Sequence, residues 1–195
     1  ITGFGADGPL KDRPGHDLGY IARAGLLEQN APSGETPTVP GFQIADIAGG
    51  GLYAALAVVG ALYRRERTGE GEFLDISMTE GALSLHLPTQ AAAGAGKEVE
   101  PGEGMLTGGI PAYNVYETAD GEYLAVGALE PKFWSRLVEL IEVPELVADG
   151  HDSGEAGEET REKLAEIFAE KSRDEWVELF DGEEVCVEPV QSPAD

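Results

Sequence analysis

The sequence predicts an α/β fold in two parts, a helix-rich α/β part followed by a small α+β part. The first part contains a long apolar segment, from Ile47 to Tyr63, and one strand-like segment, from Phe73 to Met78. Beyond a low-complexity connector, Ala91 to Gly104, the pattern changes to a β-hairpin followed by amphipathic helices. We therefore expect a domain boundary within the connector.

Three helices are expected in the first part. The segment from Asp17 to Leu27 can form a short helix. Asp46 stands directly before the long apolar segment, and we interpret it as the N-cap of a buried helix. This helix is expected to end near Thr68, where Gly69 stops it. After the strand-like segment, Thr79 is expected to cap the next helix.

The second part shows strong local signals. Two strands, Ala112 to Glu117 and Glu122 to Ala128, are joined across Asp120-Gly121, a dipeptide typical of a tight hairpin turn. One amphipathic helix follows Pro131, a favourable first helical residue. In the other helical region, Ser172 with a glutamate three residues later predicts a capping box.

The net charge of −24, from 37 acidic and 13 basic residues, excludes recognition of nucleic acid or of an anionic membrane by a basic face. The acidic residues are spread along the whole sequence rather than gathered in one tail. Such an excess repels itself at low salt, so we favour a salt-rich cytoplasm over an acidic protein of ordinary salinity.

The longest apolar run, Ile47 to Tyr63, reaches the lower limit for a membrane span. It begins at a carboxylate and ends in Arg64-Arg65-Glu66-Arg67, so we predict a buried helix of a protein that does not bind membranes. The single cysteine, Cys186, permits no internal disulfide, and no secretory signal opens the chain, so we expect a cytoplasmic protein. The opening Ile1-Thr2-Gly3-Phe4 resembles the end of a buried strand, which suggests that an N-terminal portion is missing.

The most informative residues are a His16-Asp17 pair in a loop rich in glycine and proline, and Asp46 before the glycine-opened helix. Imidazole is the side chain best suited to move protons near neutral pH. Free N–H groups at a helix start can hold a developing negative charge. The combination predicts proton abstraction next to a carbonyl, with the enolate oxygen held at the helix end. Alternatively, His16 is an ordinary loop histidine and Asp46 only an N-cap.

Two other patterns predict no site. Gly3 to Gly8 matches the dinucleotide fingerprint, but Pro9 and Pro14 follow, so no helix start is available for a pyrophosphate. With three scattered histidines and one cysteine, a bound metal is not expected. We interpret His86 and His151 as surface or helix residues rather than ligands.

Several segments together resemble the α-methylacyl-CoA racemases of the family III CoA-transferase (CaiB/BaiF) group. These segments are Gly3-Phe4-Gly5, Gly8-Pro9, Pro14-Gly15-His16-Asp17, Ala45 to Gly51, Arg67 to Gly71, Asp75, Met78 to Gly81, Met105 to Gly109, and Val126 to Pro131. The resemblance covers the chain to about Val190, but not a whole family protein. It implies a segment of a Rossmann-like large domain over residues 1–100, a small α+β domain over 101–185, and the start of a return to the large domain over 186–195. It also implies an interlocked homodimer.

The activity implied by the resemblance is a 1,1-proton transfer at the α-carbon of a 2-methylacyl-CoA. No cofactor is implied, because CoA is part of the substrate. His16 and Asp46 correspond to the two bases, and Glu130 corresponds to the small-domain carboxylate that orients the imidazole from the partner subunit. The positions that correspond to contacts with the CoA pantetheine are Gly15, Asp17 and Tyr20.

Two alternatives remain. In a true CoA-transferase, Asp46 would attack a thioester and form an aspartyl anhydride, without a base at His16. Transferases of the group usually place an aromatic residue at that position and lack the Ala-Leu-Glu-Pro segment, so His16 and Glu130 favour the racemase. Taken alone, Glu130 before Pro131 can also be a solvated turn residue. The other alternative is an inactive CoA-binding or dimerising fragment.

Overall fold

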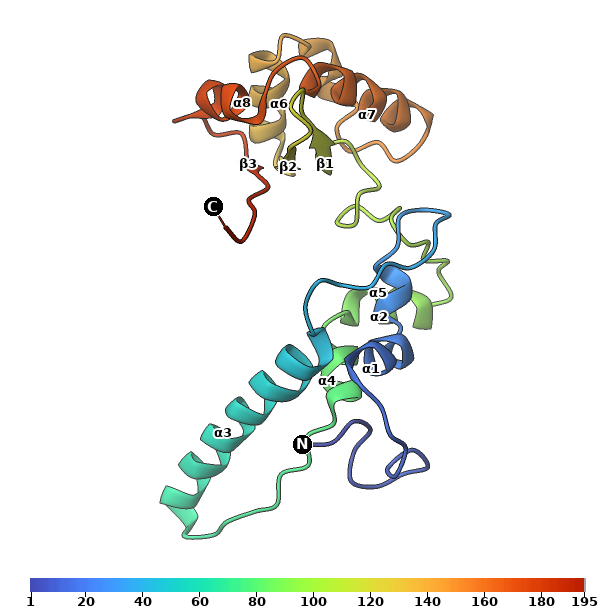
Figure 1. Ribbon diagram of the computed structural model, residues 1–195, viewed down its shortest axis with the longest axis vertical. Coiled ribbons are helices and arrows are strands. Elements are labelled where there is room, and N and C mark those ends of the chain that lie inside the picture. Colours follow the sequence, from blue (N-terminus) through green and yellow to red (C-terminus); the bar gives the residue numbers. More distant parts are fainter. Residues whose placement is uncertain (195) are drawn as a thin grey trace. The chain divides into compact units, whose positions relative to one another are not determined.

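The computed structural model describes residues 1–194, which form two compact units, residues 1–101 and 102–194 (Figure 1). Each unit has its own hydrophobic core. The first is helical, and the second carries a small antiparallel sheet with helices. A Rossmann-like large domain and an interlocked dimer stay predictions.

Six helical segments make up the first unit. They are α1 (Asp17–Ala24), α2 (Leu26–Gln29), the π-helix η1 (Ile44–Leu52), α3 (Tyr53–Thr68), α4 (Met78–Ser84) and α5 (Leu87–Gly94). The predicted helix from Asp17 to Leu27 is thus broken at Gly25, whose φ of 82° is a left-handed conformation that favours glycine. The core of this unit is small, and its buried members are Tyr20, Ile21, Ala24, Ala45 and Ala82.

The π-helix η1 and α4 cross with their backbones in direct contact. A Cβ atom added to Gly81 would lie 2.0 Å from the carbonyl oxygen of Gly49, and one added to Gly49 would lie 2.6 Å from the carbonyl oxygen of Met78. Neither distance is possible for a real side chain. The glycines at the start of the long apolar segment therefore set the position of η1, and with it that of Asp46.

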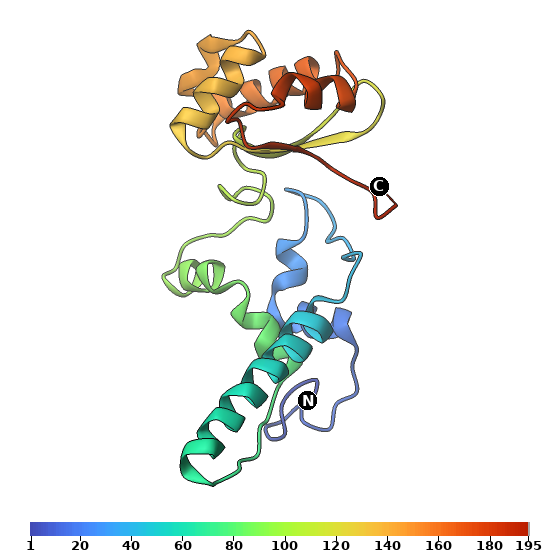
Figure 2. The same cartoon turned by 90° about the vertical axis from the view of Figure 1, so that its left-hand side faces the viewer.

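The prediction that the long apolar helix is buried is wrong for the described chain. None of the residues of α3 is buried, and Leu56 and Val59 are 72% and 65% exposed. Figures 1 and 2 show α3 extending away from the other helices of its unit as a single rod. Within residues 1–101, the unit to which α3 belongs, no layer covers this helix.

The helical stretch Ile44–Thr68 has a mean hydropathy of 1.6 in its most apolar window, of which 17% is buried. By length and composition alone it is able to cross a membrane, although core helices of soluble proteins pass the same test. The absence of a membrane partner stays a prediction. The predicted end of the helix is confirmed: Gly69 has a φ of 76° and donates its N–H to the carbonyl of Arg65.

Two local predictions for the first unit are wrong. Residues 73–78 form no strand. Their only β-type pairing within the described residues is one isolated parallel bridge between Ser77 and Thr2, and a single bridge does not make a strand. The residue that caps α4 is Ser77, whose hydroxyl accepts the N–H of Glu80 at 3.2 Å. The hydroxyl of Thr79 instead donates to the carbonyl of Gly3.

The second unit contains a sheet in the order β1 (Tyr113–Glu117), β2 (Tyr123–Gly127), β3 (Val187–Pro189), with both pairs antiparallel. The predicted hairpin is confirmed, and Gly121 at its turn has a φ of 78°. Strand β3 was not predicted. Residues 186–195 were expected to lead back to the large domain, and within the described chain they begin by pairing with β2.

Helices cover one side of this sheet in both views (Figures 1 and 2). They are α6 (Pro131–Leu140), the 3-10 helix η2 (Pro144–Ala148), α7 (Glu155–Phe168) and α8 (Arg173–Phe180). The helix after Pro131 and the capping box of Ser172 and Glu175 are confirmed. Trp134, Phe168 and Trp176 fill the core between helices and sheet, each at most 1% exposed.

Candidate active site

A pocket of about 310 Å³ in the first unit brings together two segments that are distant in the sequence, residues 16–18 and 39–46. His16 and Asp17 come from the start of α1, and Asp46 from the first turn of η1. The loop before η1 supplies the remaining wall, which is apolar apart from Gln43. The residues that line the pocket are His16, Asp17, Leu18, Val39, Pro40, Phe42, Gln43 and Asp46.

The backbone of His16 is fixed while its imidazole is left exposed. His16 occupies the N-cap position of α1 in an extended conformation, and its carbonyl accepts the N–H groups of Gly19 and Tyr20. Its side chain makes no cap hydrogen bond. The imidazole is therefore held at the pocket by its backbone and remains accessible for proton transfer.

Gly15 and Tyr20 support the backbone next to His16. The hydroxyl of Tyr20 donates to the carbonyl of Gly15 at 2.6 Å, and a Cβ atom on Gly15 would lie 2.6 Å from the Tyr20 ring. The ring is buried against Phe4. Neither residue is among those that line the pocket. Of the three expected CoA contacts, Asp17 alone reaches the pocket, and the assignment of all three stays a prediction.

The interpretation of Asp46 as an N-cap is wrong. The π-helix begins at Ile44, and Gln43 occupies the N-cap position without a side-chain cap hydrogen bond. Asp46 is therefore the third residue of the helix. The backbone N–H of Asp46 donates to the carboxylate of Asp17 at 2.8 Å, and that of Ile47 donates to the carbonyl of Gln43 at 3.2 Å. These two N–H groups are therefore occupied and cannot hold an enolate oxygen. The side chain of Asp46 remains exposed at the pocket.

Glu130 belongs to the second unit. It occupies the N-cap position of α6, and its exposed side chain makes no hydrogen bond to that helix. Pro131, the next residue, begins the helix and disfavours helical backbone at Glu130, which has a φ of −77° and a ψ of 137°. The carboxylate is thus presented from the start of a helix that packs into the core of the second unit.

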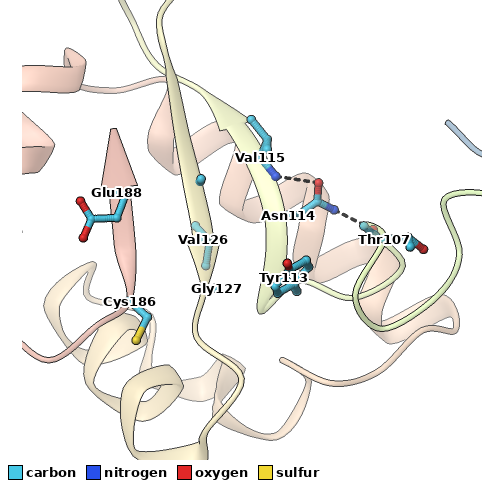
Figure 3. Close-up of a pocket in the computed structure, with 10 residues that line it drawn as sticks. Thr107, Tyr113, Asn114, Val115, Val126, Gly127, Cys186 and Glu188 are labelled. Atoms are coloured by element: carbon cyan, nitrogen blue, oxygen red, sulfur yellow. Dashed lines mark hydrogen bonds between the residues drawn. The ribbon is translucent and has the colours of Figure 1, made fainter. Parts of the chain in front are cut away.

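The second unit also has a pocket that the sequence analysis missed. It has a volume of about 480 Å³ and lies along the face of the sheet that the helices leave uncovered (Figure 3). Tyr113 and Val115 line it from β1, and Cys186 and Glu188 from the C-terminal segment. The side chain of Asn114 is occupied there, because it donates to the carbonyl of Gly108 and accepts the N–H of Val115. Along β1 the apolar residues Tyr113 and Val115 are exposed while Tyr116 is buried. An alternation of this kind in the sequence indicates that the outer face of the sheet is apolar as well.

No group of three or more His, Cys, Asp or Glu side chains with the arrangement of a metal site occurs within residues 1–194. The two histidines without a predicted partner are both hydrogen bonded. Nε2 of His86 lies 2.7 Å from the carbonyl oxygen of Ala24, and Nε2 of His151 lies 2.6 Å from that of Leu129. Because a carbonyl oxygen accepts, each Nε2 carries the proton.

Comparison with known proteins agrees with the resemblance. Residues 1–195 match the model of CoA-transferase family III. The chain is 42% identical over 193 residues to human alpha-methylacyl-CoA racemase, covering 97% of this chain and 50% of the relative. It is 30% identical over 200 residues to mouse succinyl-CoA:glutarate CoA-transferase, covering 100% of this chain and 45% of the relative.

A solved structure is similar over the same extent. The crystal structure of the hypothetical protein Rv3272 from Mycobacterium tuberculosis superposes with a TM-score of 0.76 at 29% identity, covering 99% of this chain and 52% of the other. The chain therefore spans about half the length of the relatives it matches.

Proposed function

The chain belongs to CoA-transferase family III, and we propose that the protein carrying it racemises 2-methylacyl-CoA thioesters by proton transfer at the α-carbon. His16 and Asp46 act as the two bases, one on each face of that carbon. The thioester activates the α-proton, and the negative charge moves to the thioester oxygen as an enolate. No cofactor takes part in this scheme, because the CoA moiety belongs to the substrate.

The observation that carries the proposal is the shared pocket of His16 and Asp46. A two-base racemase needs two proton-transfer groups at one carbon, and these residues come from separate segments that meet at one cavity. The imidazole and the carboxylate are both exposed to the cavity, and the hydrogen bond from the Asp46 backbone to Asp17 leaves the Asp46 side chain available. The identity of 42% to a named racemase supports the same assignment.

The enolate oxygen needs a hydrogen-bond donor other than the N–H groups of Asp46 and Ile47, which are occupied. Gln43 lines the pocket and carries a carboxamide that donates through its NH₂ group. We assign it this role. Gln43→Leu should then lower the turnover number about 10²-fold, the usual effect of losing one such donor.

Glu130 completes the proposal. In a homodimer of the kind implied by the resemblance, the carboxylate of Glu130 from the partner subunit accepts a hydrogen bond from the imidazole of His16. Such a bond fixes the tautomer and the orientation of the ring. The exposed position of Glu130 at the start of α6 supports this role.

The test is deuterium uptake at C2 of each enantiomer of a 2-methylacyl-CoA, followed together with the change in configuration. The experiment requires the whole protein that carries this chain. Uptake of deuterium accompanied by inversion is the expected result. Absence of both would refute the proposal, and a CoA-binding or dimerising role would remain only if CoA transfer is absent as well.

The second candidate is CoA transfer between acids, with Asp46 as the nucleophile. The similarity to a succinyl-CoA:glutarate CoA-transferase favours it, as does the exposure of the Asp46 carboxylate at the pocket. Transfer of CoA from an acyl-CoA to a free acid, without deuterium uptake at C2, would establish this function instead. The same samples serve for both measurements.

A further inference from the structure

We propose that His151 is a positioning residue that fixes the orientation of Glu130. The imidazole Nε2–H of His151 donates a hydrogen bond of 2.6 Å to the carbonyl oxygen of Leu129, which lies 22 positions away in the sequence. The carbonyl of Leu129 and the N–H of Glu130 belong to one planar peptide unit. A bond that holds this carbonyl therefore holds the plane from which the Glu130 side chain projects.

The backbone that carries His151 is anchored on both sides. Before it, the carbonyl of Gly150 accepts the N–H of Ala112 at 3.0 Å, and a Cβ atom on Gly150 would lie 2.3 Å from the Trp134 ring. After it, the carboxylate of Asp152 accepts the N–H of Gly154 at 2.7 Å, next to the start of α7. His151 thus reaches Leu129 from a rigid support.

The other side of Glu130 is restrained independently. Pro131 confines the Glu130 backbone to the extended region, and the carbonyl of Glu130 accepts the N–H groups of Phe133 and Trp134 in the first turn of α6. Upstream, the N–H of Leu129 donates to the carbonyl of Gly127. With the His151 bond added, rotation within the Glu130 side chain is the main freedom that remains.

This inference rests on the proposed function, in which Glu130 orients the imidazole of a base. A displacement of about 1 Å of a catalytic group relative to the substrate can lower the rate about 10²-fold. A carboxylate on an exposed helix start needs its backbone fixed if it is to meet an imidazole in one geometry. His151 supplies that restraint without contacting the reacting atoms.

The first test measures order and does not depend on activity. The backbone order parameter of Glu130, from ¹⁵N relaxation of the labelled protein, should fall in His151→Ala and stay near the wild-type value in His151→Gln, whose amide can donate to the same carbonyl. The control is His86→Ala, which removes an equivalent bond to Ala24 in the first unit and should leave Glu130 unchanged. An unaltered Glu130 order parameter in His151→Ala would overturn the inference.

The second test asks whether His151 acts through Glu130. His151→Ala should lower kcat for deuterium uptake at C2 about tenfold with little change in KM, and His151→Gln should restore it. In a Glu130→Gln background the His151→Ala change should have no further effect, because coupled residues are not additive. A further tenfold loss in that background would contradict the inference. Full activity of Glu130→Gln alone would instead refute the proposed role of Glu130, and the order parameters would then decide whether His151 holds this backbone.

Discussion

The carboxylate of Asp17 accepts a hydrogen bond of 2.8 Å from the backbone N–H of Asp46. This bond ties the first turn of α1 to the first turn of η1, two segments that are far apart in the sequence. His16 directly precedes Asp17, and both lie with Asp46 at the same pocket. The spacing of the two proposed bases therefore depends on a third residue that needs no chemical role of its own.

We expect Asp17→Ala to lower the free energy of unfolding by about 1 kcal/mol, the usual effect of removing a side-chain acceptor from a helix start. Asp17→Asn keeps an acceptor oxygen and should lose less. Deuterium uptake at C2 should fall more in the alanine variant than its folded fraction explains, because the two bases lose their common restraint. Urea unfolding and the exchange assay on the same samples check this, and equal activity of wild type and Asp17→Ala would contradict it.

His16→Ala and Asp46→Asn separate the two candidate functions. In the racemase each should abolish inversion at C2, because each base serves one face of the carbon. In the transferase Asp46→Asn should abolish CoA transfer while His16→Ala leaves it largely intact. Chiral analysis of the product acyl-CoA measures the first outcome, and transfer to a labelled acid measures the second. Normal inversion in His16→Ala would remove the two-base mechanism.

Gly81→Ala should strongly destabilise the first unit. Its Cβ atom would lie 2.0 Å from the carbonyl oxygen of Gly49, so the backbones of η1 and α4 would have to separate. Gly60→Ala is the matched control, because beyond its chain neighbours and the backbone of its own helix no atom lies within 4 Å of the Cβ atom added on α3. That change should stabilise the protein by about 0.5–1 kcal/mol through helix propensity. Thermal unfolding of both variants tests the contrast, and similar melting temperatures would show that the η1 and α4 contact is not required.

The elements that could be predicted from sequence depend on a few neighbouring residues. The turn at Gly121, the capping box of Ser172 and Glu175 and the stop at Gly69 each follow from local backbone chemistry. The pairing of strand β3 and the exposure of α3 could not be predicted, because both depend on parts of the protein that are distant in the sequence. A three-residue strand has no pattern of its own, and an apolar helix is buried only where another layer covers it.

The candidate site shows the same division. The residue types at His16 and Asp46 indicate acid-base chemistry, and this much is visible in the sequence. The Asp17 to Asp46 bond and the His151 to Leu129 bond join residues more than twenty positions apart, and neither has a sequence signature. An aspartate before an apolar run usually caps a helix, and this pattern predicts a cap at Asp46. The π-helix instead begins two residues earlier, at Ile44.

The net charge of −24 predicts that stability rises with salt. Screening shortens from about 8 Å at physiological ionic strength to about 3 Å at molar salt, which weakens repulsion among the carboxylates. The melting temperature at pH 7 should therefore increase between low and molar potassium chloride. The control is the same titration near the sequence pI of about 4.2, where the net charge is small and the effect should shrink. A melting temperature that does not rise at pH 7 would remove the basis for a salt-rich cytoplasm.

Acidification should destabilise the second unit through its helix cap. Hydrogen bonds from the side chain and then the backbone of Ser172 hold the pKa of Glu175 below its ordinary value of 4.5. The pKa of Asp120 is also lowered, first by the hydroxyl of Thr118 and then by the N–H of Arg173. Because these carboxylates bind protons less readily when folded, their contribution is fully present above the ordinary pKa values and is lost as pH falls through the lowered ones.

Glu175→Gln tests this sign directly. Glutamine can maintain a capping box but does not titrate, so the variant should lose less melting temperature than the wild type between pH 7 and pH 3. At pH 7 it should be slightly less stable, because the negative charge at the start of α8 is gone. Glu166→Gln on the exposed surface of α7 controls for removing one carboxylate. The two variants differ in whether the replaced carboxylate belongs to the capping box. If both lose the same melting temperature between pH 7 and pH 3, the capping box is not the source of the acid sensitivity.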